Sequence, residues 1–226
     1  MKSAILLLLA IFPVHQEMNL DLMLPGATTE IFSEFRNGNF AQKLIREKQG
    51  MIVRIRSRNY FDLSLPEPLF LDSTYVDALD PRLRDVVVVI FRKSPFLGDF
   101  LKNISVFLEG SIRYSGEDIP QDPLSVLMNG KAYCVGYCNL VQTLLRSAGI
   151  SSRFVRGFYL PGNESPLTPV SHRWLEIRAN VEMTFFYDPQ YQNFSSHYLM
   201  LNQGVPFEQI EKFKGYIIGS RNHFTQ

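Results

Sequence analysis

Cys134, His172 and Asp188 are three side chains of this 226-residue chain whose types could together carry out nucleophilic acyl chemistry. In that chemistry a cysteine thiolate attacks a carbonyl carbon, and a histidine takes the thiol proton and later gives it to the leaving group. A carboxylate fixes the imidazole tautomer and stabilises the imidazolium. Most free cysteines are instead small buried apolar residues, so Cys134 by itself does not indicate an enzyme. The case depends on the elements that would position the three side chains.

The segment from Gly130 to Ile150 predicts a helix with Cys134 in its first turn or just before it. Small and apolar residues recur there every three or four positions, at Val135, Cys138, Val141, Leu145 and Ala148. Gly149 is a typical stop signal for such a helix. The first turn of a helix favours an anion, so this position stabilises a thiolate at Cys134, whereas Cys138 lies a full turn further in.

The segments 170–178 and 183–188 are predicted to form two antiparallel strands. If the hairpin is centred on Asn180, opposed residue numbers sum to 360, and His172 then faces Asp188. Directly opposed side chains have Cβ atoms about 4.5–5.5 Å apart, which lets a carboxylate hold an imidazole. A slip of one residue would send the two side chains to opposite faces of the sheet.

The rest of the chain predicts a mixture of helices and strands. The pattern of each segment predicts a partly polar helical lead-in over 17–50, a helix over 96–109, strands over 51–58 and 152–160, and a loop over 161–169. For 86–91 two readings stay open. The run of valines favours a strand, whereas the preceding Asp80 and Pro81 are typical of a helix start.

Four motifs occur in an order that resembles the transglutaminase-like superfamily. They are GKAYCVGYCNL from Gly130, LLRSAGISSRFVRG from Leu144, SHRWLEI from Ser171 and FYDP from Phe186. The resemblance covers about residues 75–190 and implies that 86–91 is helical.

The resemblance implies an α+β, papain-like fold in which a central cysteine-bearing helix packs against an antiparallel sheet. It implies Cys134 as the nucleophile, His172 as the general base and Asp188 as the carboxylate that orients it. We expect Trp174, the only tryptophan, and Tyr114 to bind substrate.

Two departures from the family pattern occur near these residues. Cys138 stands where the family usually has alanine, and Phe186-Tyr187 stands where a tryptophan often precedes the aspartate. No side chain is assigned to an oxyanion hole, for which the backbone N–H of Cys134 is the candidate. A disulfide between Cys134 and Cys138 would be strained within one helical turn, so no structural disulfide is predicted.

Composition limits the classes of partner. A net charge of +1 and 46% hydrophobic residues give no electrostatic case for binding nucleic acid. The histidines and cysteines lack the spacing of metal ligands, and no cofactor is predicted.

Residues 1–16 contain a lysine followed by an apolar run over 4–12, which predicts a signal peptide and is too short to span a membrane. The predicted organisation is therefore a signal peptide over 1–16, an N-terminal lead-in over 17–74 packed on the core, and a transglutaminase-like domain over 75–226. The mature protein is expected to be exported, periplasmic or secreted, and without a membrane span.

Two functions of different classes follow from the sequence. The first is a thiol enzyme that acts on amide bonds of a protein or peptide, with cell-wall peptide among the substrates considered. It would be a cysteine protease or amidase, or a protein-glutamine acyltransferase, because both reactions use the same acyl-enzyme. The second is a non-catalytic binding or assembly module that keeps the fold. The sequence does not predict an oligomeric state.

Overall fold

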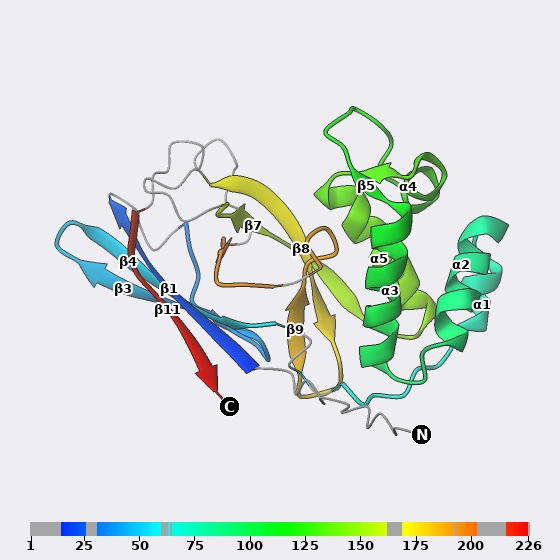
Figure 1. The fold of residues 1–226 in the computed structure, drawn as a ribbon, viewed down its shortest axis with the longest axis horizontal. Helices are drawn as coiled ribbons and strands as arrows, with labels where there is room; N and C mark the ends of the chain where they lie inside the picture. Colours follow the sequence, from blue (N-terminus) through cyan, green and yellow to red (C-terminus); the bar gives the residue numbers. More distant parts are fainter. Residues whose placement is uncertain are drawn as a thin grey trace, which may run out of the picture.

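The structure is a computed structural model, and it describes residues 15–25, 31–59, 63, 65–161, 169–192, 194–202 and 216–225. It is α+β: a five-stranded antiparallel sheet lies at one end, a four-stranded antiparallel sheet lies in the middle, and helices pack on the other side of the four-stranded sheet (Figure 1). This agrees with the predicted fold class. None of the helices in the described part of the chain is long and apolar enough to cross a membrane.

The five-stranded sheet has the order β11-β1-β4-β3-β2. Its strands are β1 (His15–Pro25), β2 (Phe35–Arg36), β3 (Phe40–Glu47), β4 (Gly50–Arg58) and β11 (Tyr216–Thr225). The strand over 51–58 is confirmed, but the helical lead-in over 17–50 is wrong. Leu20, Leu22 and Leu24 are buried, with half-exposed residues between them, which is the period of two of a strand with one covered face.

The four-stranded sheet has the order β10-β7-β8-β9. Its strands are β7 (Ser152–Tyr159), β8 (Val170–Arg178), β9 (Thr184–Tyr187) and β10 (Tyr198–Met200), which confirms the three strands predicted in this region. Both faces of β8 are covered: Trp174 belongs to the core shared with the five-stranded sheet, and Leu175 and Ile177 belong to the core shared with the helices. Residues 162–168 of the predicted loop lie outside the described residues.

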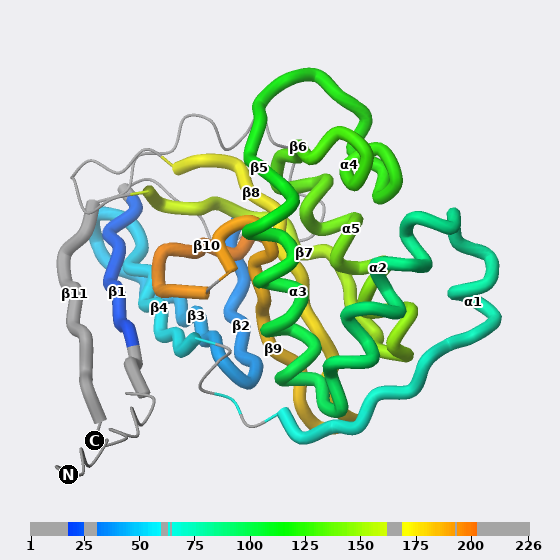
Figure 2. Tube along the Cα trace, turned by 45° about the vertical axis from the view of Figure 1, so that its right-hand side comes forward, coloured from blue at the N-terminus to red at the C-terminus, as the bar shows by residue number. Residues whose placement is uncertain are grey.

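Along the chain, α1 to α5 come after β4 of the five-stranded sheet and before β7 of the four-stranded sheet (Figure 2). They are α1 (Ser73–Asp77), α2 (Pro81–Arg92), α3 (Leu97–Ser111), α4 (Pro123–Asn129) and α5 (Cys134–Ser147), and the short strands β5 (Arg113–Tyr114) and β6 (Lys131–Ala132) form a parallel pair. Residues 86–91 are helical, because the Asp80 side chain accepts a hydrogen bond from Arg82 N and Pro81 occupies the first turn. Helix start signals therefore outweigh the β propensity of the valines.

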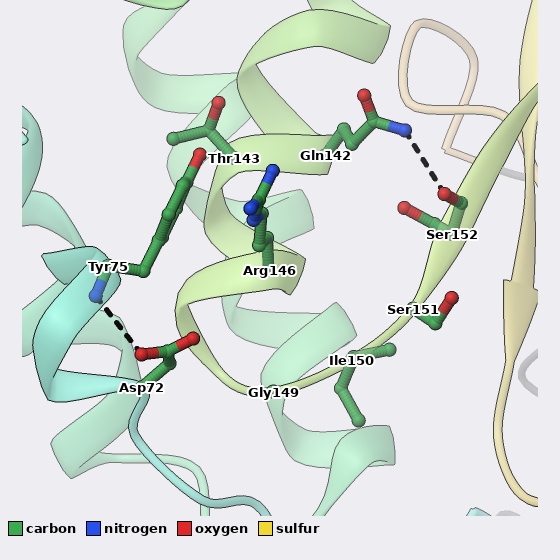
Figure 3. Close-up of a pocket in the computed structure, with 9 residues that line it drawn as sticks. All are labelled: Asp72, Tyr75, Gln142, Thr143, Arg146, Gly149, Ile150, Ser151 and Ser152. Carbon is green, nitrogen blue, oxygen red and sulfur yellow. Dashed lines mark hydrogen bonds between the residues drawn. The ribbon is translucent and has the colours of Figure 1, made fainter.

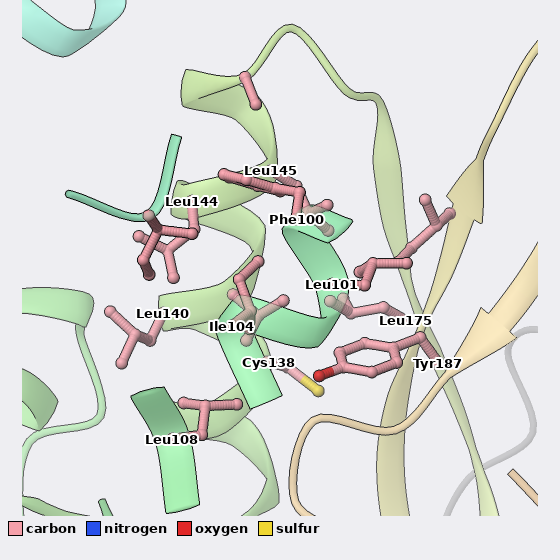
Figure 4. Close-up of a cluster of buried hydrophobic side chains, with 14 of the residues drawn as sticks. Phe100, Leu101, Ile104, Leu108, Cys138, Leu140, Leu144, Leu145, Leu175 and Tyr187 are labelled. Carbon is pink, nitrogen blue, oxygen red and sulfur yellow. The ribbon is translucent and has the colours of Figure 1, made fainter. Parts of the chain in front are cut away.

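Helix α5 is the central helix of the core, as its pattern predicts. Its buried positions go almost around the helix, because α4, β7 and β8 all pack against it. Figure 4 shows Leu140 and Leu144 of α5 among Phe100 and Ile104 of α3. The helix ends where Gly149 adopts a left-handed conformation, with φ of +72°, and Ile150 N donates to Leu145 O.

Candidate active site

The hairpin that carries His172 has a different register from the predicted one. Opposed residues of β8 and β9 sum to 362, as in the pair Glu176 and Phe186, so the predicted direct opposition of His172 and Asp188 is wrong. The turn is longer because the Asn180 side chain accepts hydrogen bonds from the N–H groups of Glu182 and Met183. A register shift of two residues leaves every side chain on the same face of the sheet. His172 and Asp188 are therefore diagonal neighbours on that face.

His172 and Asp188 are joined by a short buried hydrogen bond. His172 Nε2 lies 2.6 Å from Asp188 Oδ2, and the two side chains are 4% and 0% exposed. Asp188 directly follows β9, and its other oxygen, Oδ1, accepts from Gln190 N at 2.9 Å. A buried carboxylate held from both sides fixes both the position and the tautomer of the imidazole.

Cys134 is the half-buried first residue of α5, and its interaction with His172 is one of the causes that raise the pKa of that histidine. Because Nε2 of His172 is bound to Asp188, the nitrogen available to the thiol is Nδ1. The structure thus brings together all three residues singled out from the sequence, and they come from α5, β8 and the end of β9.

Electrostatics at this site favour a charged histidine. Burial acts to lower the pKa of His172, but the hydrogen bonds to Asp188 and Cys134 and their negative charges outweigh it, and the pKa rises from 6.5 to about 9. At neutral pH the imidazolium therefore lies between a carboxylate and the cysteine sulfur. That arrangement places a positive charge beside the sulfur of the candidate nucleophile.

Cys138 has a different environment one turn further into α5. It is fully buried, its Sγ donates to Arg173 O at 3.4 Å, and burial raises the pKa of its thiol well above the usual range. Figure 4 shows its sulfur within the apolar core between α5 and β8, beside Tyr187. Both cysteines are free thiols, and Cys138 behaves as a small apolar core residue.

The two residues expected to bind substrate lie in different places. Trp174 has no exposed surface; it stacks near His172, with ring centroids 6.3 Å apart, so the structure gives it no surface to offer a substrate. Tyr114 is 64% exposed, and its strand β5 pairs it with Ala132, two residues before Cys134. Tyr114 is therefore placed at the approach to the cysteine.

Three tyrosines that the motifs do not contain complete the surroundings of His172. Tyr159, Tyr191 and Tyr198 have ring centroids 6.0, 5.4 and 6.0 Å from the imidazole. The hydroxyl of Tyr198 also donates a hydrogen bond to Asp188 Oδ2, at 2.5 Å. Nothing in the sequence marks these residues, because their proximity depends on the pairing of β10 with β7 and on the loop after Asp188.

Gln121 is another residue that sequence reasoning missed. Its Oε1 accepts from Tyr133 N at 3.0 Å, and its backbone oxygen accepts from Asn139 Nδ2 at 2.8 Å, so it ties the preceding loop to the start of α5. A Cβ at Gly136 would lie 2.3 Å from Gln121 Oε1. A glycine inside a predicted helix is the signal that could have indicated this close approach.

A separate pocket of about 470 Å³ lies at the other end of α5. Figure 3 shows Arg146 beside Tyr75 at its centre, with Ser152 opposite. Arg146 is twelve residues beyond Cys134, which is about 18 Å along a helix. None of the three residues of the candidate site lines this pocket. Among the described residues, no group of three or more His, Cys, Asp or Glu side chains is placed to hold a metal ion.

Comparison with known families agrees with this geometry. Residues 89–194 match the model of the transglutaminase-like superfamily, and that span contains Cys134, His172 and Asp188. These residues form a transglutaminase-like domain. No curated protein sequence matches the chain.

Two solved structures resemble, at low sequence identity, the chain that carries this transglutaminase-like domain. One is a candidate cysteine protease from Cytophaga hutchinsonii, with 12% identity, a TM-score of 0.45, and coverage of 95% of this chain and 89% of that one. Another is the periplasmic domain of TgpA from Pseudomonas aeruginosa, with 12% identity, a TM-score of 0.45, and coverage of 79% and 88%. At this level of similarity neither bears on the activity of the present chain.

Proposed function

We propose that the protein is a thiol enzyme that acts on amide bonds of proteins or peptides, with Cys134 as nucleophile, His172 as general base and Asp188 as the orienting carboxylate. The observation that carries the proposal is the buried imidazole of His172. One of its nitrogens is held 2.6 Å from Asp188, and the other is left for the thiol at the start of α5. A non-catalytic module would have no need for an imidazole held in this way.

The proposed reaction has two steps that share one intermediate. The Cys134 sulfur attacks the amide carbon, and the backbone N–H of Cys134, in the first turn of α5, supports the negative charge on the oxygen. The C–N bond then breaks, His172 gives its proton to the departing nitrogen, and a thioester remains on Cys134. In the second step His172 removes a proton from water or from an amine, which attacks the thioester and restores the thiol.

Water as the second nucleophile makes the protein a cysteine protease or amidase, and a primary amine makes it a protein-glutamine acyltransferase. Both outcomes need access to the thioester from solvent. Cys134 is only half-buried, and the exposed Tyr114 is paired with Ala132, two residues before it, so an acceptor can approach from this side. We propose hydrolysis as the main outcome, with protein or peptide substrates that include cell-wall peptide.

An experiment can test the proposal and separate the two outcomes. The protein is incubated with casein and a fluorescent primary amine, and both peptide release and amine incorporation are measured. We expect one of the two signals for the wild-type chain and neither for Cys134→Ala. Cys138→Ala serves as the matched control, because it removes the neighbouring thiol and leaves the site residues in place. Equal signals from Cys134→Ala and the wild-type chain would contradict the proposal.

Export is a further part of the proposal, with residues 1–16 as signal peptide. The other proposed parts are 17–74 as the N-terminal part and 75–226 as the enzyme domain. The end of the latter, β11, pairs with β1, so it belongs to the same sheet as the N-terminal part. Residues 1–14 lie outside the described residues, so support comes from the apolar run in the sequence. N-terminal sequencing of protein from culture supernatant or periplasm tests it. A mature chain that still begins with Met1 would contradict it.

A further inference from the structure

Tyr198 lies on β10, the edge strand of the four-stranded sheet opposite to β9, and its side chain contacts the candidate site. It begins β10 and pairs with Tyr159 of β7, whereas His172 lies on β8 and Asp188 at the end of β9. Its hydroxyl nevertheless donates to Asp188 Oδ2 at 2.5 Å. This is the same oxygen that lies 2.6 Å from His172 Nε2.

The aromatic ring of Tyr198 is fixed in this position. The side chain is fully buried, its ring stacks on Phe194 with centroids 4.0 Å apart, and Trp174 meets its edge at 5.3 Å. A ring packed on two sides cannot turn its hydroxyl away without opening the core. The packing of the ring therefore holds the hydroxyl against Asp188.

Asp188 needs these donors because its carboxylate has no exposed surface. Its Oδ1 accepts from the backbone N–H groups of Gln190 and Tyr191, at 2.9 and 3.4 Å, and its Oδ2 receives His172 and Tyr198. A buried carboxylate without enough donors is costly and tends to take up a proton. Tyr198 supplies the only side-chain donor to Asp188 besides His172 among the hydrogen bonds of the described residues.

We propose that Tyr198 is a positioning residue that shares the Oδ2 oxygen of Asp188 with His172 and thereby sets the upper pH limit of the Cys134–His172 pair. The proposal rests on the proposed function, because it assigns a role relative to that pair. Tyr198 does not touch the reacting atoms, and it acts only through Asp188.

The direction of the effect follows from the charge on Oδ2. With two donors, the negative charge of this oxygen is divided between the tyrosine hydroxyl and the imidazolium. Without the hydroxyl, Oδ2 interacts with the imidazolium alone, which holds its proton more strongly. Removing the Tyr198 hydroxyl therefore moves the loss of the His172 proton to higher pH.

Other titratable and charged groups around the pair come from every neighbouring element. They are Cys134 and Cys138 of α5, Tyr159 of β7, Arg173 of β8, Tyr191 after β9, and Tyr114 of β5, which acts on Tyr191. None of these groups hydrogen-bonds to Asp188 Oδ2 among the described contacts, so the proposed substitution leaves them in place.

The test compares Tyr198→Phe with Tyr187→Phe. Tyr187 is also fully buried, and its hydroxyl bonds to Ser105 Oγ at 3.1 Å, so the control removes a buried tyrosine hydroxyl that does not touch Asp188. Both changes are made in the Cys134→Ala chain, and the ring signals of His172 are followed by NMR across the pH range. We expect the His172 transition to move upward by up to about one pH unit in Tyr198→Phe, since a hydrogen bond to a charged group is worth about that much. In Tyr187→Phe it should stay in place.

A His172 transition that is the same in both variants would overturn the proposal. If Tyr198→Phe does not fold, the hydroxyl proton of Tyr198 is sought in the otherwise native chain as a downfield NMR signal. The proposal then requires that this signal be present and that it be lost in Asp188→Asn; its absence from the native chain would overturn it. Because the main readout uses the Cys134→Ala chain, it does not depend on amide turnover. A shift without any amidase or acyltransferase activity in the native chain would contradict the proposed function alone.

Discussion

Gly157→Ala is the substitution that most directly tests how the sheet supports the site. Gly157 of β7 pairs with His172 on one side and Met200 on the other. A Cβ added there would lie 2.2 Å from Leu199 O and 2.5 Å from Trp174 Cη2. Ordinary contacts begin at about 3.4 Å, so both β10 and the Trp174 ring must move by roughly 1 Å relative to β7.

The cost of this substitution can be estimated from those two contacts. Overpacking a dense core costs about 1–3 kcal/mol, and the upper end applies because one of the contacts is backbone. For a chain of this size, about 3 kcal/mol corresponds to a fall in melting temperature of roughly 6–12 °C. Movement of β10 also displaces Tyr198, so the rate of Cys134 alkylation should change.

Thermal unfolding and alkylation by iodoacetamide provide the assay. Gly116→Ala is the control, because a Cβ at that position meets nothing within 4 Å, and it should change stability by less than about 0.5 kcal/mol. If Gly157→Ala unfolds at the same temperature as Gly116→Ala, the described packing of Trp174 against β7 and β10 is wrong.

Three further predictions concern the charged site and its neighbour. Because the pKa of His172 is raised from 6.5 to about 9, the stabilisation of the fold by its charged form is fully present below pH 6.5. This stabilisation is lost as the pH rises through about 9. The free energy of unfolding should fall by up to about 3 kcal/mol over that window, and His172→Ala should abolish this fall in denaturant titrations. Asp188→Asn should lower the alkylation rate of Cys134 at pH 6 by less than His172→Ala does, because it disturbs orientation without removing the base; equal rates in these two variants would contradict this. Cys138→Ala should keep the alkylation rate of Cys134 and lower the free energy of unfolding by about 1 kcal/mol, because one buried sulfur is removed. A large fall in that rate would show that the thiol of Cys138 contributes to the reactivity of Cys134.

The local elements near the site could be predicted because their sequence patterns agree with their environment. The apolar positions of α5 and the stop at Gly149 give a helix with Cys134 at its start, and β8 and β9 follow from their strand character. The predicted register was wrong, but the prediction that His172 and Asp188 share one face of the sheet was right. Opposed residue numbers sum to 362 and not 360, and a shift by two residues leaves each side chain on the same face. What decided the register was the turn at Asn180, whose side chain hydrogen bonds are not specified by strand periodicity.

The N-terminal part shows where the sequence was insufficient. Phe32, Phe35 and Phe40 have spacings that fit a helix, but in the structure Phe35 stacks on Phe186 at 5.1 Å and Phe40 meets Phe194 at 5.5 Å. These contacts join residues about 150 positions apart, so they decide the local structure through packing that no local pattern reveals. The same holds for Tyr198, whose role depends on a strand that pairs with β7 from the far side.

Alkylation of Cys134 and Cys138 across pH shows whether Cys134 and His172 form a reactive pair. Mass spectrometry after brief treatment with iodoacetamide reports each residue separately in one sample. At pH 6 we expect Cys134 to be alkylated at least about tenfold faster than the fully buried Cys138, and the rate for Cys134 to fall in His172→Ala. Alkylation of Cys138 at the rate of Cys134, or an unchanged rate for Cys134 in His172→Ala, would contradict it.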